Sequence, residues 1–126
     1  MVTGFVDTTV LVDVIRKYLP AVSWLQAQGT LGITPIVWME LVSGAQNKAS
    51  QLRALKMLAR FEMIYLTQAD MDWAMQQLLT HSLSHNVEIM DCLIASVSHR
   101  LQLPLYTHNL KHIEPILGKP LTVKPY

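Results

Sequence analysis

Short apolar runs alternate along this chain with longer segments in which apolar residues recur three or four positions apart. The short runs predict buried strands at residues 2–6, 31–33, 61–66 and 103–107, with a last edge strand at 121–123. The periodic segments predict helices at residues 9–15, 20–28, 35–43, 47–61, 68–80 and 88–101. This alternation indicates an α/β fold in which a short, mostly parallel central sheet is flanked by helices. No linker or repeat interrupts the pattern, so residues 1–126 are expected to form one domain.

Residues typical of helix N-termini support the predicted starts of two helices, at residues 35 and 68. Thr34 followed by Pro35 is typical of an N-cap with proline at the first helical position. Thr67 and Asp70 resemble a capping box. The helix that begins there is expected to turn one apolar stripe inward, made of Met71, Ala74, Met75, Leu78 and Leu79. Residues 108–113 are expected to form a loop or a single helical turn.

The chain carries few charges, and this changes how its surface is interpreted. Charged residues make up 15% of the sequence and hydrophobic residues 51%, with a net charge of +1. A charge so close to zero does not argue for bulk attraction to nucleic acid or to a membrane. The apolar helices around Trp24, Trp38 and Met57 suggest a surface that a partner chain covers, although a tight core explains the composition nearly as well.

The sequence shows no sign of secretion or membrane insertion. The single Cys92 excludes an internal disulfide and suits a reducing cytosol, where it is expected to be a small buried apolar residue. The N-terminus lacks a basic segment, and Asp7 and Asp13 interrupt any signal-peptide core. No apolar run approaches the length of about 18 residues that a membrane span needs. A cytoplasmic protein without a membrane contact is expected.

Three carboxylates stand out because apolar residues flank each of them. Asp7 follows the first strand and precedes a helix that Thr8 or Thr9 is expected to cap. Glu40 is the only charge on its helix, and Asp91 lies in the first turn of a largely buried helix. Three sheltered carboxylates that converged would repel one another unless a cation lay between them. Mg²⁺, or Mn²⁺ in its place, is the natural occupant of such an oxygen site.

A purely structural interpretation remains open at this point. Asp7 could cap a helix, Asp91 could interact with a helix dipole, and Glu40 could pair with a lysine. His81 and His85 have a zinc-compatible spacing, but they lie in a polar segment without the glutamate of an H-E-x-x-H motif, so surface histidines are expected.

Four short motifs resemble those of the PIN-domain ribonucleases, and their order and spacing cover nearly the whole chain. The N-terminal motif resembles D-T-N-V-L, the second carries a glutamate in a helix, the third resembles D-x-L-I-A-A, and the fourth resembles L-x-T-x-N/D at a strand end. In this sequence they are Asp7-Thr8-Thr9-Val10-Leu11, Thr34-Pro35-Ile36-Val37-Trp38-Met39-Glu40-Leu41-Val42-Ser43-Gly44, Asp91-Cys92-Leu93-Ile94-Ala95-Ser96 and Leu105-Tyr106-Thr107-His108-Asn109. The chain length suits VapC-type toxins of toxin–antitoxin pairs.

The resemblance implies a function and a set of site residues. It implies a Mg²⁺-dependent endoribonuclease in which Asp7, Glu40 and Asp91 hold the metal. Thr107 would support the site, and Asn109 or Thr107 would orient water or phosphate. The implied partners are an RNA substrate, a cognate antitoxin and a second copy of the chain in a homodimer.

Two departures from the family pattern leave alternatives open. Thr9 replaces the common asparagine, a mild change that keeps a capping oxygen. Asn109 and His112 occupy the positions where the family often supplies a fourth carboxylate, so Glu88 or Glu114 would have to complete the site. A catalytically weakened module that binds RNA or protein is therefore an alternative.

A phosphoryl-transfer enzyme with Asp7 as nucleophile is a further alternative. Its D-x-D-x-[TV] pattern would require a second aspartate at position 9, where this sequence has Thr9.

Overall fold

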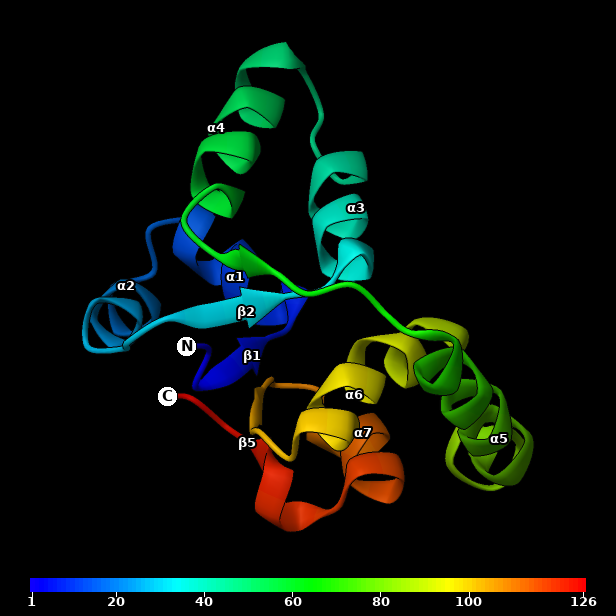
Figure 1. The fold of residues 1–126 in the computed structure, drawn as a ribbon. Helices are drawn as coiled ribbons and strands as arrows, with labels where there is room; N and C mark the ends of the chain where they lie inside the picture. Colours follow the sequence, from blue (N-terminus) through cyan, green and yellow to red (C-terminus); the bar gives the residue numbers. More distant parts are fainter.

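The computed structural model describes residues 1–126 and contains a five-stranded sheet in the order β3-β2-β1-β4-β5 (Figure 1). Every neighbouring pair of strands is parallel. The strands are very short and span Gly4–Val6 (β1), Leu31–Ile33 (β2), Glu62–Met63 (β3), Leu105–Tyr106 (β4) and Thr122–Val123 (β5). The predicted α/β architecture is confirmed, and the sheet is fully parallel.

The strand order reverses at β1, which is where open parallel sheets form a crevice. The chain adds β2 and β3 on one side of β1 and then returns to add β4 and β5 on the other. Ligands in open parallel sheets collect where the strand order reverses, at the carboxyl ends of the strands. Val6 pairs with Tyr106 in the β1–β4 register, so Asp7 and Thr107 are the next residues at that edge.

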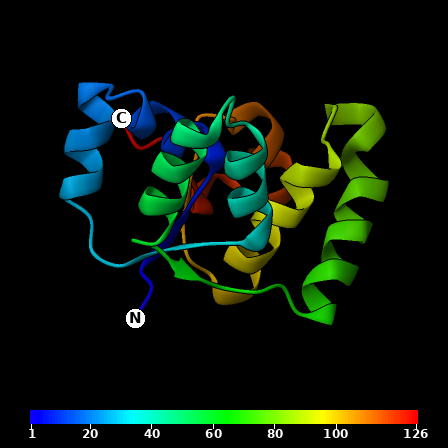
Figure 2. The ribbon, with the colours of Figure 1, turned by 90° about the horizontal axis from the view of Figure 1, so that it is seen from above.

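Seven helices surround the sheet in two groups. The first group, α1 to α4, is connected by contacts of α1 with α2, α3 and α4, and of α3 with α4. The second group contains α6 and α7, with α5 packed outside them (Figure 2). The helices span Thr8–Ile15 (α1), Leu19–Gln26 (α2), Pro35–Ser43 (α3), Lys48–Leu58 (α4), Gln68–His85 (α5), Ile89–Leu101 (α6) and Leu110–Leu117 (α7), and a 3-10 turn, η1, covers Lys119–Leu121. No helix is long and apolar enough to cross a membrane.

The core lies between the sheet and both helix groups. Phe5 in β1, Leu11 in α1 and Val97 in α6 are almost fully buried, and Cys92 is buried beside them as expected. β2 packs closely against Phe5, because a Cβ atom at Gly32 would lie 2.9 Å from the Phe5 ring. This close packing holds β1, which Asp7 directly follows, against β2.

Two predicted N-caps are confirmed. The Thr34 hydroxyl accepts a hydrogen bond from the Val37 N–H, and Thr67 forms a reciprocal capping box with Asp70. In contrast, residues 110–117 form a complete helix, α7, where a loop or a single turn was predicted. Pro115 lies inside this helix and would be expected to break it. Burial of three apolar residues of α7 against the core stabilises the helix nevertheless; these residues are Ile113, Ile116 and Leu117.

The prediction for the apolar stripe of α5 is wrong in part. Only Ala74 of the five predicted inward residues is buried, and Leu78 is half-buried. Met75 and Leu79 are 66% and 77% exposed, and Leu83 is 97% exposed on the same helix. The helix also continues to His85 instead of ending near residue 80. Trp24, Trp38 and Met57 themselves pack against the core, but each of their helices also carries an exposed apolar residue: Leu19 on α2, Met39 on α3 and Leu52 on α4.

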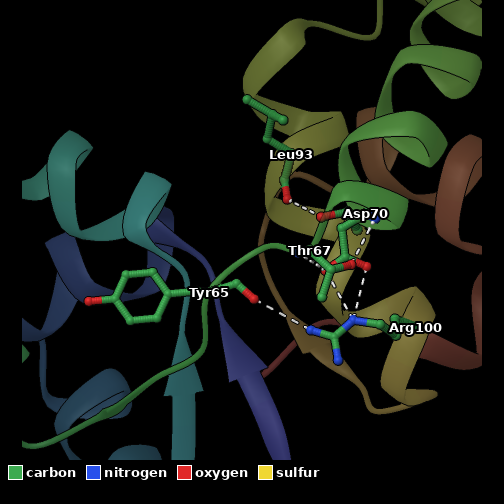
Figure 3. A network of polar contacts seen from close by, with 6 residues as sticks. Tyr65, Thr67, Asp70, Leu93 and Arg100 are labelled. Atoms are coloured by element: carbon green, nitrogen blue, oxygen red, sulfur yellow. Dashed lines mark hydrogen bonds and ion pairs between the residues drawn. The ribbon is translucent and has the colours of Figure 1, made fainter.

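One buried ion pair ties α5 to α6 (Figure 3). Asp70 is 2% exposed, and both of its carboxylate oxygens lie 3.0 Å from the Arg100 Nε atom. Arg100 also donates to the Tyr65 carbonyl oxygen at 3.4 Å. Asp70 additionally accepts the Thr67 N–H of its own capping box. This single carboxylate therefore fixes both the start of α5 and its attachment to α6.

Replacing Arg100 with alanine is expected to lower the free energy of unfolding by about 2–3 kcal/mol, because it leaves the Asp70 carboxylate buried without a cation. This loss of stability is smaller than the loss of about 3–5 kcal/mol that is typical when a fully buried ion pair is broken. The reason is that the Arg100 side chain is 33% exposed, so that solvent screens the interaction. Urea unfolding of the Arg100→Ala variant measures this loss. Arg60→Ala is the control, since Arg60 is exposed and forms no ion pair. Equal stability of the two variants would contradict the prediction.

Candidate active site

Asp7 lies at the carboxyl end of β1 and is itself the N-cap of α1. Its Oδ1 atom accepts the Thr8 N–H at 2.7 Å, so the prediction that Thr8 or Thr9 caps this helix is wrong. Asp7 has the extended backbone of an N-cap, and its carboxylate is a better partner for the positive helix end than a hydroxyl. The residue is 5% exposed.

Asp7 is joined to the end of β4 through Thr107. The buried Thr107 hydroxyl donates to Asp7 Oδ2 at 2.7 Å and accepts the Asn109 N–H at 2.9 Å. The Thr9 hydroxyl lies 3.4 Å from the same Asp7 oxygen and accepts the His108 N–H at 3.3 Å. Hydroxyl groups from two segments far apart in sequence therefore hold this carboxylate in one orientation.

Asp91 approaches the same loop from the first turn of α6. Its Oδ1 atom accepts the Asn109 side-chain N–H at 3.0 Å, and its Oδ2 atom accepts the Glu88 backbone N–H at 2.9 Å. The His112 Nδ1 atom lies 3.7 Å from Oδ2. Asn109 and His112, at the positions where the family often supplies a fourth carboxylate, thus both face Asp91. Asp91 is 9% exposed.

Glu40 reaches the site from α3, and its contact was not anticipated from the sequence. The Thr8 hydroxyl donates to Glu40 Oε1 at 2.7 Å. Glu40 forms no ion pair, so the alternative in which it pairs with a lysine is wrong. Thr8 is the residue of this candidate site that the sequence did not indicate. Its position next to Asp7, in the first turn of a helix, is the available signal.

Burial and neighbouring charges act together on Asp7. Burial raises the pKa of this carboxyl, and the hydrogen bonds from Thr107 and Thr8 lower it in part. The negative charges of Glu40 and Asp91 raise the Asp7 pKa further. The two neighbouring carboxylates therefore favour the protonated form of Asp7, as expected for like charges that lie close in space.

Cys92 is a neighbour of this crevice and not a nucleophile in it. Burial, and then the charge of Asp91, raise the pKa of the Cys92 thiol to about 11. A thiol with so high a pKa stays protonated at neutral pH and is a poor nucleophile.

The donor set suits a hard divalent cation, because it consists of carboxylate oxygens supported by hydroxyl and amide groups. No three side chains of the His, Cys, Asp and Glu types form a ready-made cluster, however. Glu40 is engaged by Thr8 and Asp91 by Asn109. A bound Mg²⁺ ion would replace these contacts with metal–oxygen bonds. His81 and His85, whose spacing is compatible with zinc, are not part of this arrangement: they lie on α5 with ring centroids 5.3 Å apart.

Comparison with known proteins identifies relatives across almost the whole chain. A family model described as the PIN domain matches residues 4–114. No curated protein sequence gives a significant match.

Several solved structures share the fold. A toxin–antitoxin complex from Klebsiella pneumoniae is 25% identical, with a TM-score of 0.79 and coverage of 98% of each chain. VapBC2 from Rickettsia felis, bound to a DNA fragment from its promoter, is also 25% identical, with a TM-score of 0.74 and coverage of 94% of this chain and 95% of that one. DNA-bound VapBC from Salmonella typhimurium is 22% identical with a TM-score of 0.77 over 94% and 95% of the two chains, and it supports the fold alone.

Proposed function

Because this chain belongs to the PIN-domain family and resembles VapC-type toxins, we propose that it is a Mg²⁺-dependent endoribonuclease and the toxin of a type II toxin–antitoxin pair. One observation carries the proposal. A chain of hydrogen bonds links the carboxylates of Asp7, Glu40 and Asp91. Thr8 donates its N–H to Asp7 and its hydroxyl to Glu40, and Thr107 and Asn109 connect Asp7 to Asp91. Carboxylates are expensive to bury together unless a cation compensates them.

The proposed roles follow from the hydrogen bonds of each residue. Asp7, Glu40 and Asp91 would hold the metal ion. Thr107 fixes Asp7 Oδ2 by donating a hydrogen bond, which leaves the other lone pairs of that carboxylate for a cation. When bound, Mg²⁺ would polarise the scissile phosphate and lower the pKa of an attacking water molecule. Mn²⁺ has the same ligand preferences.

Asn109 is proposed to orient the reacting groups. In the metal-free arrangement its side-chain N–H donates to Asp91 Oδ1. Once the metal occupies that carboxylate, the same N–H would be free to donate to a phosphate oxygen or to water. Its backbone stays fixed meanwhile by the Thr107 hydroxyl.

The proposed function is tested by incubating the purified protein with a panel of cellular RNAs, with Mg²⁺ or with a chelator. Cleavage that needs the metal and yields defined products supports an endoribonuclease. RNA binding without cleavage would instead indicate a catalytically weakened interaction module. Two observations support this alternative: Glu40 and Asp91 already accept hydrogen bonds from Thr8 and Asn109, and Asn109 is neutral where the family often has a carboxylate.

The proposed partners are an antitoxin and a second copy of the chain. The antitoxin is inferred from the toxin–antitoxin complexes among the 25% identical structures. Its apolar segment would cover the crevice, and a basic side chain would reach the carboxylates. A second copy would cover the exposed apolar face of α5, which is formed by Met71, Met75, Leu79 and Leu83. We place the proposed activity in the cytoplasm, where its RNA substrates are found.

Leu79→Glu is expected to convert the homodimer to a monomer, because it places a charge in the centre of the exposed α5 face. Sedimentation velocity at matched concentrations measures the change. Gln68→Glu adds the same charge at the exposed start of α5 and is the control. A parent protein that sediments as a monomer, or a Leu79→Glu variant that remains a dimer, would contradict this assignment.

A further inference from the structure

A groove of about 420 Å³ runs from the carboxylate site along α1, α3 and α4. Thr8 and Glu40 line one part of it, so it is continuous with the proposed active site. The remaining wall comes from the end of α1, from the α3–α4 loop and from the start of α4, and α3 and α4 lie side by side in Figure 1. The residues at this far end include Arg16, Gln46, Asn47, Ser50 and Arg53.

The residues that line the groove carry more positive than negative charge. Glu40 is its only acidic residue, whereas two arginines, Arg16 and Arg53, also line it. Both arginines are exposed, and neither forms an ion pair or a side-chain hydrogen bond with another residue of the chain. Arg100, in contrast, is held by Asp70. Two unpaired guanidinium groups in a groove that leads to a proposed phosphodiester-cleaving site are available for anions.

We propose that this groove binds the backbone phosphates of the RNA strand next to the cleaved bond, through Arg16 and Arg53; this inference rests on the proposed function. Guanidinium groups match phosphate oxygens in geometry and charge. A single RNA strand repeats its phosphates along its length, so one strand would supply the reacting phosphate and the neighbouring ones together. Val12 and Ile15 give the groove an apolar wall against which sugars and bases can pack.

The observations favour RNA over an acidic protein segment. Phosphates are already required at the Glu40 end of the groove by the proposed reaction. The start of α4 also lies at the groove, and its positive helix end adds to the attraction for phosphate. Asn47 and Ser50 also line the groove, where they form the capping box that starts α4.

The test measures binding of a fluorescein-labelled oligouridylate by anisotropy, in an Asp7→Asn background so that cleavage does not interfere. Arg16→Gln and Arg53→Gln are each expected to weaken binding by about threefold to tenfold. The slope of log Kd against log salt should fall by about 0.7 for each arginine removed, as for the loss of one phosphate contact to a single strand. Arg60→Gln, an exposed arginine outside this groove, should change neither quantity.

The outcomes separate this inference from the proposed function. If the parent cleaves RNA with Mg²⁺ but the Arg16→Gln/Arg53→Gln double variant binds like Arg60→Gln, the groove proposal is overturned and the nuclease remains. If the parent does not cleave but both arginines contribute to binding as expected, the groove proposal stands and the catalytic one falls. A double variant that loses binding to oligoglutamate and keeps its RNA affinity would assign the groove to a protein segment and overturn the proposal. Unchanged thermal melts exclude misfolding.

Discussion

Asp7→Asn is expected to reduce RNA cleavage by at least about 100-fold, since even residues that only support a metal ligand cost 10- to 100-fold when replaced. The same variant is expected to raise the melting temperature of the metal-free protein. Asn retains the N-cap of α1, because Asn and Asp are equally good caps. It removes a buried negative charge that lies close to Glu40 and Asp91.

The pH dependence of this stabilisation has a definite sign. Burial raises the folded-state pKa of Asp7 above its unfolded value, so folding of the parent is favoured while the carboxyl is protonated. That contribution is complete below the unfolded pKa and is lost as pH rises through the folded pKa. Asp7→Asn should therefore exceed the parent in melting temperature at neutral pH, and the difference should disappear in acid.

Calorimetric melts in a chelator and gel assays of RNA cleavage measure the two effects. Asp72→Asn is the matched control, because Asp72 is an exposed acid on α5 outside the crevice. It should leave cleavage and the pH profile unchanged. An Asp7→Asn variant that cleaves RNA like the parent would show that the site assignment is wrong.

Features that depend on local chemistry could be predicted from the sequence. The Thr34–Pro35 helix start and the Thr67–Asp70 capping box use side chains within a few residues of the backbone groups they bind. The strands at 31–33 and 122–123 and the alternation of strands and helices were also predictable, because hydrophobic period and turn residues both indicate them.

Features that depend on tertiary packing could not be predicted in this way. α5 has apolar residues on more than one face, and the positions of α6 and α7 decide that Ala74 is buried and Leu79 exposed. α7 contains Pro115, and its stability comes from burial of neighbouring apolar residues that no local signal reports. The 3-residue strand β1 likewise gives no information about its neighbours in the sheet.

The candidate site depends partly on local sequence signals and partly on tertiary packing. The sheltered positions of Asp7, Glu40 and Asp91 follow from their apolar flanks in the sequence. The hydrogen bond between Asp7 and Thr107 spans 100 residues and requires β1 and β4 to be neighbours, which only the strand order establishes. The Thr8–Glu40 contact depends in the same way on the packing of α1 against α3.

Asn109→Asp is expected to tighten Mg²⁺ binding by about tenfold, equivalent to about 1.4 kcal/mol. Hard cations gain mainly from anionic oxygens, and this change adds a carboxylate beside Asp91. Without metal the same substitution should destabilise the protein. It replaces the 3.0 Å hydrogen bond from Asn109 to Asp91 with repulsion between two carboxylates. Mg²⁺ should therefore raise the melting temperature of Asn109→Asp by more than that of the parent.

Titration calorimetry with MgCl₂ and thermal melts with and without metal measure these opposite effects. His112→Asp should act in the same direction but more weakly, because the His112 Nδ1 atom lies 3.7 Å from Asp91 and makes no hydrogen bond to it. Gln68→Glu adds a carboxylate far from the crevice and should change neither quantity. If both Asn109→Asp and His112→Asp left the Mg²⁺ affinity unchanged, the metal would not lie next to the loop after Thr107. Glu88 or Glu114 would then be the better candidate for a fourth ligand.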